Sequence, residues 1–71
     1  MITYAPLWKT ISEKGIKKTE LAKTYGVIST STLAKLGRNS PLNTETIDKL
    51  CKFLKCPITD VVEFVDDSTK D

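Results

Sequence analysis

Two helix-start patterns, one on each side of a glycine, constrain this chain more than any other feature of its sequence. The clearer pattern lies in the second half of residues 17–36. If Ser29 caps a helix, its hydroxyl can accept a hydrogen bond from the first turn, and Ile28 and Leu33 stand where two apolar side chains pack across a helix start. The pattern therefore predicts a helix that begins just after Ser29.

The second pattern lies nearer the N-terminus. With Lys17 at the cap position, Glu20 is the third helical residue, and its carboxylate can accept a hydrogen bond from the Lys17 amide. Lysine has no side-chain acceptor, so this start is only half complete. Gly26 separates the two patterns and can take the left-handed conformation in which a helix ends most easily. We therefore expect two short helices joined by a tight turn.

The second of these helices has one apolar side and one side of small or basic residues. Leu33 and Leu36 are three residues apart and point toward the core. The opposite side then carries Thr30, Ser31, Ala34 and Lys35. Lysine can donate to guanine, hydroxyls can bond to several bases, and a methyl group can contact that of thymine. This order of elements predicts a helix-turn-helix whose second helix, residues 30–37, enters the major groove of double-stranded DNA.

Two longer helices are predicted on either side of this pair. Residues 5–14 form a first helix that stops at Gly15, with Trp8 in the core or half-buried. Asn43 caps a later helix. The apolar stripe of that later helix consists of Ile47, Leu50, Cys51 and Leu54.

Further predictions concern the C-terminal part of the chain. Phe53 lies off the apolar stripe, so it packs either against a neighbouring element or against a partner subunit. Residues 57–62, with an acidic first turn, predict a short fifth helix. If residues 63–65 are extended, their expected partner is the segment 2–4, either within the chain or across a dimer.

Length and charge narrow the class of function. The 71 residues allow one small domain. No apolar run is as long as the ~20 residues that a helix needs to cross a bilayer. Residues 1–40 carry seven basic and two acidic side chains (+5), whereas residues 41–71 carry four and seven (−3), which together give the net charge of +2. The positive half contains the two paired helices, and its charge would attract the phosphate backbone of a nucleic acid. The alternative is a solvated lysine surface without a partner, which would have the same number of basic side chains. Without a secretory signal, we expect a cytoplasmic protein with no membrane contact.

Catalytic and metal sites are not predicted. The chain has no histidine, and Cys51 and Cys56 supply at most half of a tetrahedral zinc site, so buried, structural thiols are expected. The carboxylates are scattered over polar faces, and no glycine-rich phosphate loop is present. We therefore expect no enzymatic activity, no cofactor, no metal and no small-molecule ligand.

Taken in order, these features resemble the Cro and phage-repressor type of helix-turn-helix protein, in the small stand-alone form of bacterial and phage regulators. The resemblance implies an all-α, compact five-helix fold like that of lambda repressor, with short extended terminal segments as a possible addition. It also implies one DNA-binding domain over residues 1–65, followed by a polar, acidic tail, residues 66–71, that frays. The matching stretches are Thr19-Glu20-Leu21-Ala22, Gly26, residues 29–36, residues 46–54 and residues 60–62.

The resemblance also implies how such a chain meets DNA. Family members bind DNA with the third helix, and many act as homodimers on inverted half-sites. Lys18 matches a phosphate-contacting position, whereas Arg38 either binds phosphate or only complements the helix dipole. The full predicted DNA-binding set is Lys17, Lys18, Thr19, Ser29, Thr30, Ser31, Thr32, Ala34, Lys35, Arg38 and Asn39.

One departure from the family pattern affects the register of the recognition helix. The interval from Gly26 to Leu33 is one residue longer than the family usually has, so either Val27 or Ile28 is additional. Because the start pattern at Ser29 is intact, we predict that the turn absorbs the insertion. The alternative is a shifted helix with different base-facing residues.

The sequence thus predicts a sequence-specific transcriptional regulator that binds double-stranded DNA as a homodimer and represses. The alternative is a protein-interaction module, antitoxin-like or anti-repressor, that keeps the fold without strong DNA binding. The modest net charge and the acidic second half of the chain favour this alternative.

Overall fold

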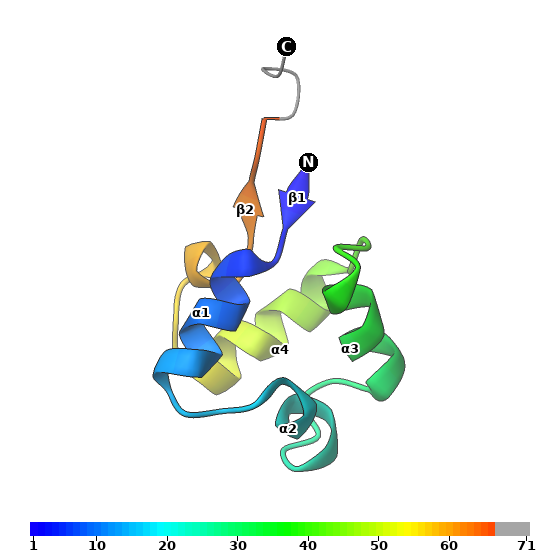
Figure 1. Cartoon of the computed structure of the whole chain (residues 1–71), viewed down its shortest axis with the longest axis vertical. Coiled ribbons are helices and arrows are strands. Elements are labelled where there is room, and N and C mark those ends of the chain that lie inside the picture. The colour runs from blue at the N-terminus through cyan, green and yellow to red at the C-terminus, as the bar shows by residue number, and fades with distance from the viewer. Residues whose placement is uncertain (67–71) are drawn as a thin grey trace.

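The computed structural model describes residues 1–66 and consists of four α-helices, one short 3-10 helix and a two-stranded sheet. The four α-helices pack together, and the sheet, formed by the two ends of the described chain, extends from one end of this body (Figure 1). Apart from Asp66, the predicted polar tail lies outside the described residues. In chain order the elements are β1 (Ile2–Thr3), α1 (Ala5–Glu13), α2 (Lys18–Lys23), α3 (Thr30–Gly37), α4 (Thr44–Leu54), the 3-10 helix η1 (Ile58–Asp60) and β2 (Glu63–Phe64).

The predicted helix starts are confirmed. The Ser29 hydroxyl accepts a hydrogen bond from the Thr32 amide at 3.1 Å, and the Asn43 side-chain oxygen accepts one from the Thr46 amide at 3.0 Å. At α2 the Lys17 amide donates to Glu20 Oε1 at 2.8 Å, and the lysine side chain makes no cap bond. The first-turn amides of α3 and α4 are therefore better satisfied than those of α2.

Three helices end in the same way, with one left-handed residue followed by a backbone hydrogen bond to the carbonyl five positions back. This is the Schellman arrangement, which stops a helix and satisfies a free carbonyl. The left-handed residues are Gly15 after α1 (φ 73°), Asn39 after α3 (φ 55°) and Lys55 after α4 (φ 55°). The hydrogen bonds run from Ile16 to Ile11 at 2.8 Å, from Ser40 to Lys35 at 2.9 Å and from Cys56 to Cys51 at 3.1 Å.

The core lies where α1, α2, α3, α4 and η1 meet. Trp8 is half-buried against it, as predicted, and Phe53 packs against a neighbouring element, since its ring centroid lies 5.0 Å from that of Tyr25. The prediction of buried thiols was wrong in degree, because Cys51 and Cys56 are both half-buried. The fully buried apolar side chains are Tyr4, Leu7, Ile11, Leu21, Ile28, Leu36, Leu50, Leu54 and Val61.

The two terminal segments pair within the chain, as one of the two predicted alternatives required. Ile2 lies opposite Phe64 and Thr3 opposite Glu63 in an antiparallel ladder. The pairing continues beyond the strands, because the Met1 amino group donates to the Val65 carbonyl at 2.6 Å and the Val65 amide donates back at 2.7 Å.

The prediction of an all-α fold with five helices needs correction. The fifth helix is a single 3-10 turn, and the segment that follows it is a strand. Lys55 ends α4 in the left-handed conformation, and Pro57 after it is extended (φ −74°, ψ 166°). Only a few residues therefore remain between the end of α4 and β2, which pairs with β1. This segment is too short for a second α-helical turn.

Candidate nucleic-acid interface

The paired helices α2 and α3 are held together by a turn that folds back onto Leu21. The Leu21 side chain is fully buried, and its carbonyl accepts hydrogen bonds from Val27 at 2.8 Å and from Ile28 at 3.4 Å. Gly26 takes the left-handed conformation, with φ 63°, that the turn requires. Because α3 still begins at Thr30 with Ser29 as its cap, the turn absorbs the additional residue, as predicted.

The outer face of α3 points to solvent along the whole helix. Leu36 is fully buried and Leu33 is half-buried, which fixes the inner side of α3. The side chains predicted on the opposite side are all exposed, namely Thr30, Ser31, Ala34 and Lys35. This face carries hydroxyl, methyl and ammonium groups, which can bond to or contact base edges.

The hydroxyl groups at the start of α3 bond mostly to one another. Ser29 Oγ lies 3.1 Å from Ser31 Oγ and donates to Thr32 Oγ1 at 3.0 Å. Thr32 is half-buried, and within residues 1–66 the Thr30 hydroxyl takes no part in this network. Of the four hydroxyls, Thr30 is therefore the one outside the network, whereas the other three already use part of their hydrogen-bonding capacity.

The start of α2 presents ammonium groups instead. Lys17, Lys18 and Thr19 are exposed, and the Lys18 ammonium lies 4.5 Å from the centroid of the Trp8 ring. A cation over an aromatic face is worth about 0.5–1 kcal/mol at an exposed site, so Trp8 holds this ammonium near α1. The sequence did not predict the contact, because Trp8 and Lys18 lie on different helices.

The far end of α3 is anchored by Tyr4. The Tyr4 amide donates to the Asn39 side-chain oxygen at 3.1 Å, and the Tyr4 hydroxyl donates to the Ser40 carbonyl at 2.7 Å. Burial raises the pKa of Tyr4, so its hydroxyl remains a donor. The left-handed conformation of Asn39 was predicted from the sequence, but its bond to Tyr4 was not. Arg38, beside it, is exposed at the end of α3, about 12 Å along the helix axis from Thr30.

One basic residue outside the predicted set also lies beside this surface. Lys49 and Thr46, on α4, line a groove of about 430 Å³ together with Thr32 and the turn residues 26–29. The groove brings the Lys49 side chain close to the start of α3. In the sequence Lys49 resembles the other polar residues of an amphipathic helix, so nothing there distinguishes it.

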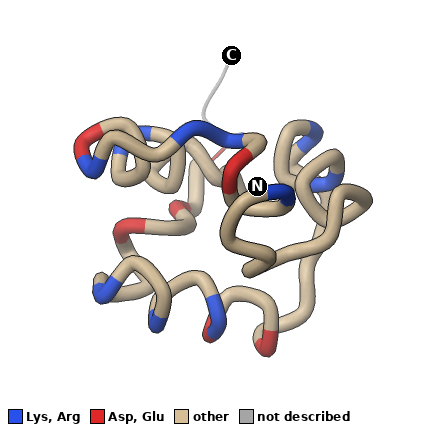
Figure 2. The backbone as a smooth tube through the Cα atoms, turned by 90° about the horizontal axis from the view of Figure 1, so that it is seen from below, with Lys and Arg blue, Asp and Glu red and all other residues tan. Residues whose placement is uncertain are grey.

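The helices differ in the sign of their charges. Helix α3 carries one basic residue, Lys35, and no acidic one, whereas α4, along the lower edge of Figure 2, carries both signs. On α4 the exposed Lys52 and Asp48 form an ion pair at 3.0 Å. The α3 surface is therefore the one that repels phosphate least, in agreement with the charge asymmetry of the sequence.

Two further findings apply to residues 1–66. In this range no group of three or more histidine, cysteine, aspartate or glutamate side chains is placed to hold a metal ion. No helix in the same range is both long and apolar enough to cross a bilayer.

Comparisons with known proteins agree with this geometry. The sequence profile of the Cro/C1-type HTH (helix-turn-helix) DNA-binding domain matches residues 6–67. Among solved structures, the crystal structure of the transcriptional regulator VanUg is 33% identical in sequence, with a TM-score of 0.83. That match covers 93% of this chain and 87% of the other. No curated protein matches at a significant level.

Proposed function

Because this chain belongs to the Cro/C1-type helix-turn-helix DNA-binding domain family, we propose that it is a sequence-specific transcriptional regulator that places α3 in the major groove. The observation that carries the proposal is the exposed outer face of α3, which carries Lys35 and no acidic residue. VanUg, whose crystal structure is similar, is a transcriptional regulator.

The exposed residues divide into two roles. Lys35, Thr30 and Ala34 face the base edges and supply the sequence preference, with Lys35 donating to guanine. Lys17 and Lys18 contact phosphates and fix the position of the domain without reading sequence. The Ser29 network uses part of the hydrogen-bonding capacity of Ser29, Ser31 and Thr32, whereas Thr30 keeps all of its own.

We further propose that the protein acts as a homodimer and represses. Two copies related by a two-fold axis would read inverted half-sites about 34 Å apart, which multiplies the modest selectivity of one α3. The sheet offers apolar surface for association, since Phe64 is 68% exposed and Met1, Ile2 and Val65 are also exposed. A dimer bound over a promoter would block access by other proteins, so repression is the proposed outcome.

The alternative function is a protein-interaction module that keeps the fold without strong DNA binding. The same exposed apolar side chains of the sheet favour it, because a heterologous partner could cover them as well as a second copy could. Stable association with another protein, together with no salt-sensitive DNA affinity, would identify this function.

The deciding experiment is fluorescence anisotropy of a labelled random-sequence duplex, titrated with the protein across salt concentrations. Log affinity is expected to fall linearly with log salt, with a slope of about 0.9 per phosphate contacted. Lys18→Ala should lower the slope by about one and weaken binding to all sequences alike. Lys52→Ala, on the mixed-charge surface of α4, is the matched control and should leave the slope unchanged.

Trp8 offers a second readout from the unlabelled protein. It is the chain's one tryptophan and lies under the Lys18 ammonium, so phosphate contact at Lys18 should change its emission. No binding at low salt in either assay would contradict the proposed function and favour the protein-interaction alternative.

A further inference from the structure

The two cysteines occupy the Schellman pair at the end of α4. Lys55 is left-handed and the Cys56 amide donates to the Cys51 carbonyl at 3.1 Å, which folds the chain back on the last turn of the helix. In this motif the side chains of the two hydrogen-bonded residues commonly touch. At the end of α1 the same two places hold Ile11 and Ile16. On α4 these two places hold cysteines instead of isoleucines.

Both cysteines are free, and the backbone hydrogen bond sets them next to each other at the end of the helix. Burial raises the pKa of Cys56, and the neighbouring Cys51 and Asp60 raise it further, while Lys14 acts in the opposite direction. Cys56 therefore remains a neutral thiol at neutral pH. This pair therefore suits a ligand that reacts with neutral thiols by condensation. It suits a ligand that requires two thiolates less well, because the carboxylate of Asp60 lies nearby.

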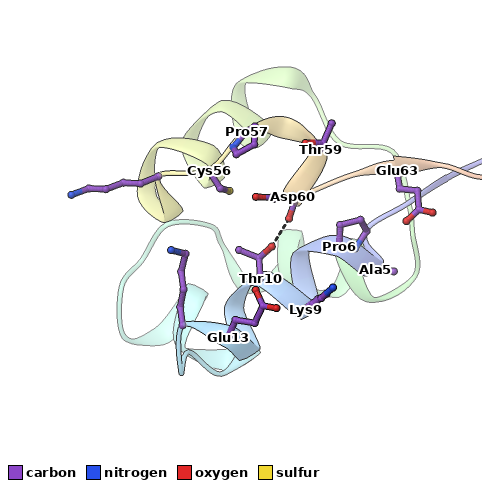
Figure 3. A pocket seen from close by; sticks show the side chains of 12 residues that line it. Ala5, Pro6, Lys9, Thr10, Glu13, Cys56, Pro57, Thr59, Asp60 and Glu63 are labelled. Atoms are coloured by element: carbon purple, nitrogen blue, oxygen red, sulfur yellow. Dashed lines mark hydrogen bonds between the residues drawn. The ribbon is translucent and has the colours of Figure 1, made fainter.

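Both cysteines can be reached from the surface. Cys56 borders a cleft of about 710 Å³ between α1 and η1, into which its side chain points (Figure 3). The wall of this cleft is held by the Thr10 hydroxyl, which donates to the Asp60 carbonyl at 2.8 Å. Cys51 borders a second hollow beside Ile58. The thiols are thus both half-buried and open to a small reagent.

We propose that Cys51 and Cys56 form a bidentate binding site for trivalent arsenicals. Two thiols supply only half the donors of a tetrahedral zinc site, and within residues 1–66 no group of three or more histidine, cysteine, aspartate or glutamate side chains is placed to complete one. A linear two-coordinate ion needs its sulfurs on opposite sides, whereas the backbone bond sets Cys51 and Cys56 side by side at the end of α4. A pyramidal arsenic(III) centre holds two sulfurs close together and gives a neutral product, which fits a half-buried site.

The reaction with an arsenoxide balances without an oxidant. Two S–H bonds break and two As–S bonds form, the arsenic oxygen leaves as one molecule of water with both thiol protons, and arsenic stays trivalent. The product closes a ring across the end of α4, where the backbone already holds the two residues together. This site does not depend on the DNA-binding proposal, because it involves α4 and η1 and leaves the outer face of α3 untouched.

The test is titration of the reduced full-length chain with phenylarsine oxide, followed by intact mass and by counting the remaining thiols under denaturing conditions. We expect one phenylarsenic group per chain, with both thiols consumed. Release should require a dithiol such as 2,3-dimercaptopropanol, and excess monothiol should be ineffective. Cys51→Ala and Cys56→Ala each leave one thiol, so their adducts should be held about 100-fold less tightly, since the chelate advantage is lost.

Circular dichroism before and after addition checks that each chain is folded. Single variants that bind as tightly as the parent chain would overturn the proposal, as would an adduct on the parent chain that consumes one thiol. If either variant fails to fold, the parent chain alone decides the question. Removal of its adduct by excess monothiol would then count against a bidentate site.

Discussion

The starts of α2 and α3 differ in almost every physical respect, although the two helices form one unit. Helix α3 begins with a serine cap whose hydroxyl also bonds to two neighbouring hydroxyls. Helix α2 begins at a lysine without an acceptor, and its next residue, Lys18, is held over the Trp8 ring. The comparison indicates that the two helix starts have different roles. The hydroxyl bonds at the start of α3 hold a fixed shape, whereas the start of α2 presents positive charge.

The largest expected effect comes from removing the residue that joins the two helices. Leu21→Ala should lower the free energy of unfolding by about 2–5 kcal/mol, since Leu21 is fully buried beneath the turn and its loss leaves a cavity. Urea unfolding monitored by circular dichroism measures the loss. Ile58→Ala removes an apolar side chain that is 52% exposed and should cost about 0.5 kcal/mol or less. Equal losses for the two variants would show that the turn is not anchored by Leu21.

The second effect tests whether only the α3 face reads sequence. Lys35→Ala should weaken binding to the preferred site by about 1–3 kcal/mol and relax the preference at one base position. Site selection from a random pool followed by anisotropy measures both quantities. Lys52→Ala, on the surface of α4, should change neither. A loss that is the same on preferred and random DNA would reduce Lys35 to a phosphate contact.

The third effect concerns the cap of α3. Ser29→Ala removes the acceptor for the Thr32 amide and should destabilise the protein by about 0.5–2 kcal/mol. Ser12→Ala, at an exposed position within α1, should stay within about 0.5 kcal/mol of the parent chain. Thermal unfolding of both variants gives the comparison. An unchanged midpoint for Ser29→Ala would mean that the hydroxyl network does not stabilise the helix start.

The smallest expected effect comes from giving α2 a cap residue like that of α3. Lys17→Ser gives α2 the acceptor it lacks and should raise the free energy of unfolding by about 0.5–1 kcal/mol. The same change removes a positive charge, so the salt slope of DNA binding should fall by about one. Lys17→Ala removes the charge without adding an acceptor and should reproduce the change in slope but not the added stability. A variant that gains stability without any change in slope would exclude Lys17 from the phosphate contacts.

The parts of this fold that the sequence predicted well are those decided within one turn of helix. Ser29, Asn43 and Glu20 were recognised as cap residues because a helix start needs acceptors at fixed offsets, and all three make the expected bonds. The position of α3, including the absorbed insertion, followed from the Ser29 cap. The outward direction of Lys35 followed from the buried leucine on the other side of the same helix.

The parts that were missed depend on contacts between distant residues. The Asn39 side chain bonds to the Tyr4 amide across 35 positions, and Lys49 lies beside the turn at the start of α3 only because α4 packs there. The pair of cysteines shows which part of a feature can be predicted from the sequence and which part cannot. The spacing of Cys51 and Cys56 was visible, but the backbone bond between them depends on Lys55 adopting a left-handed conformation, which glycine or asparagine would have signalled better.

The sequence by itself determined where the helices begin, which side of each helix is apolar and which half of the chain is basic. These properties depend on cap acceptors, helical periodicity and charge, all of which are local. Only the tertiary structure decided that Lys18 lies over Trp8 and that the last predicted helix shrinks to one 3-10 turn before a strand. Those outcomes depend on which surfaces meet and how far the chain must reach, and no local pattern encodes either.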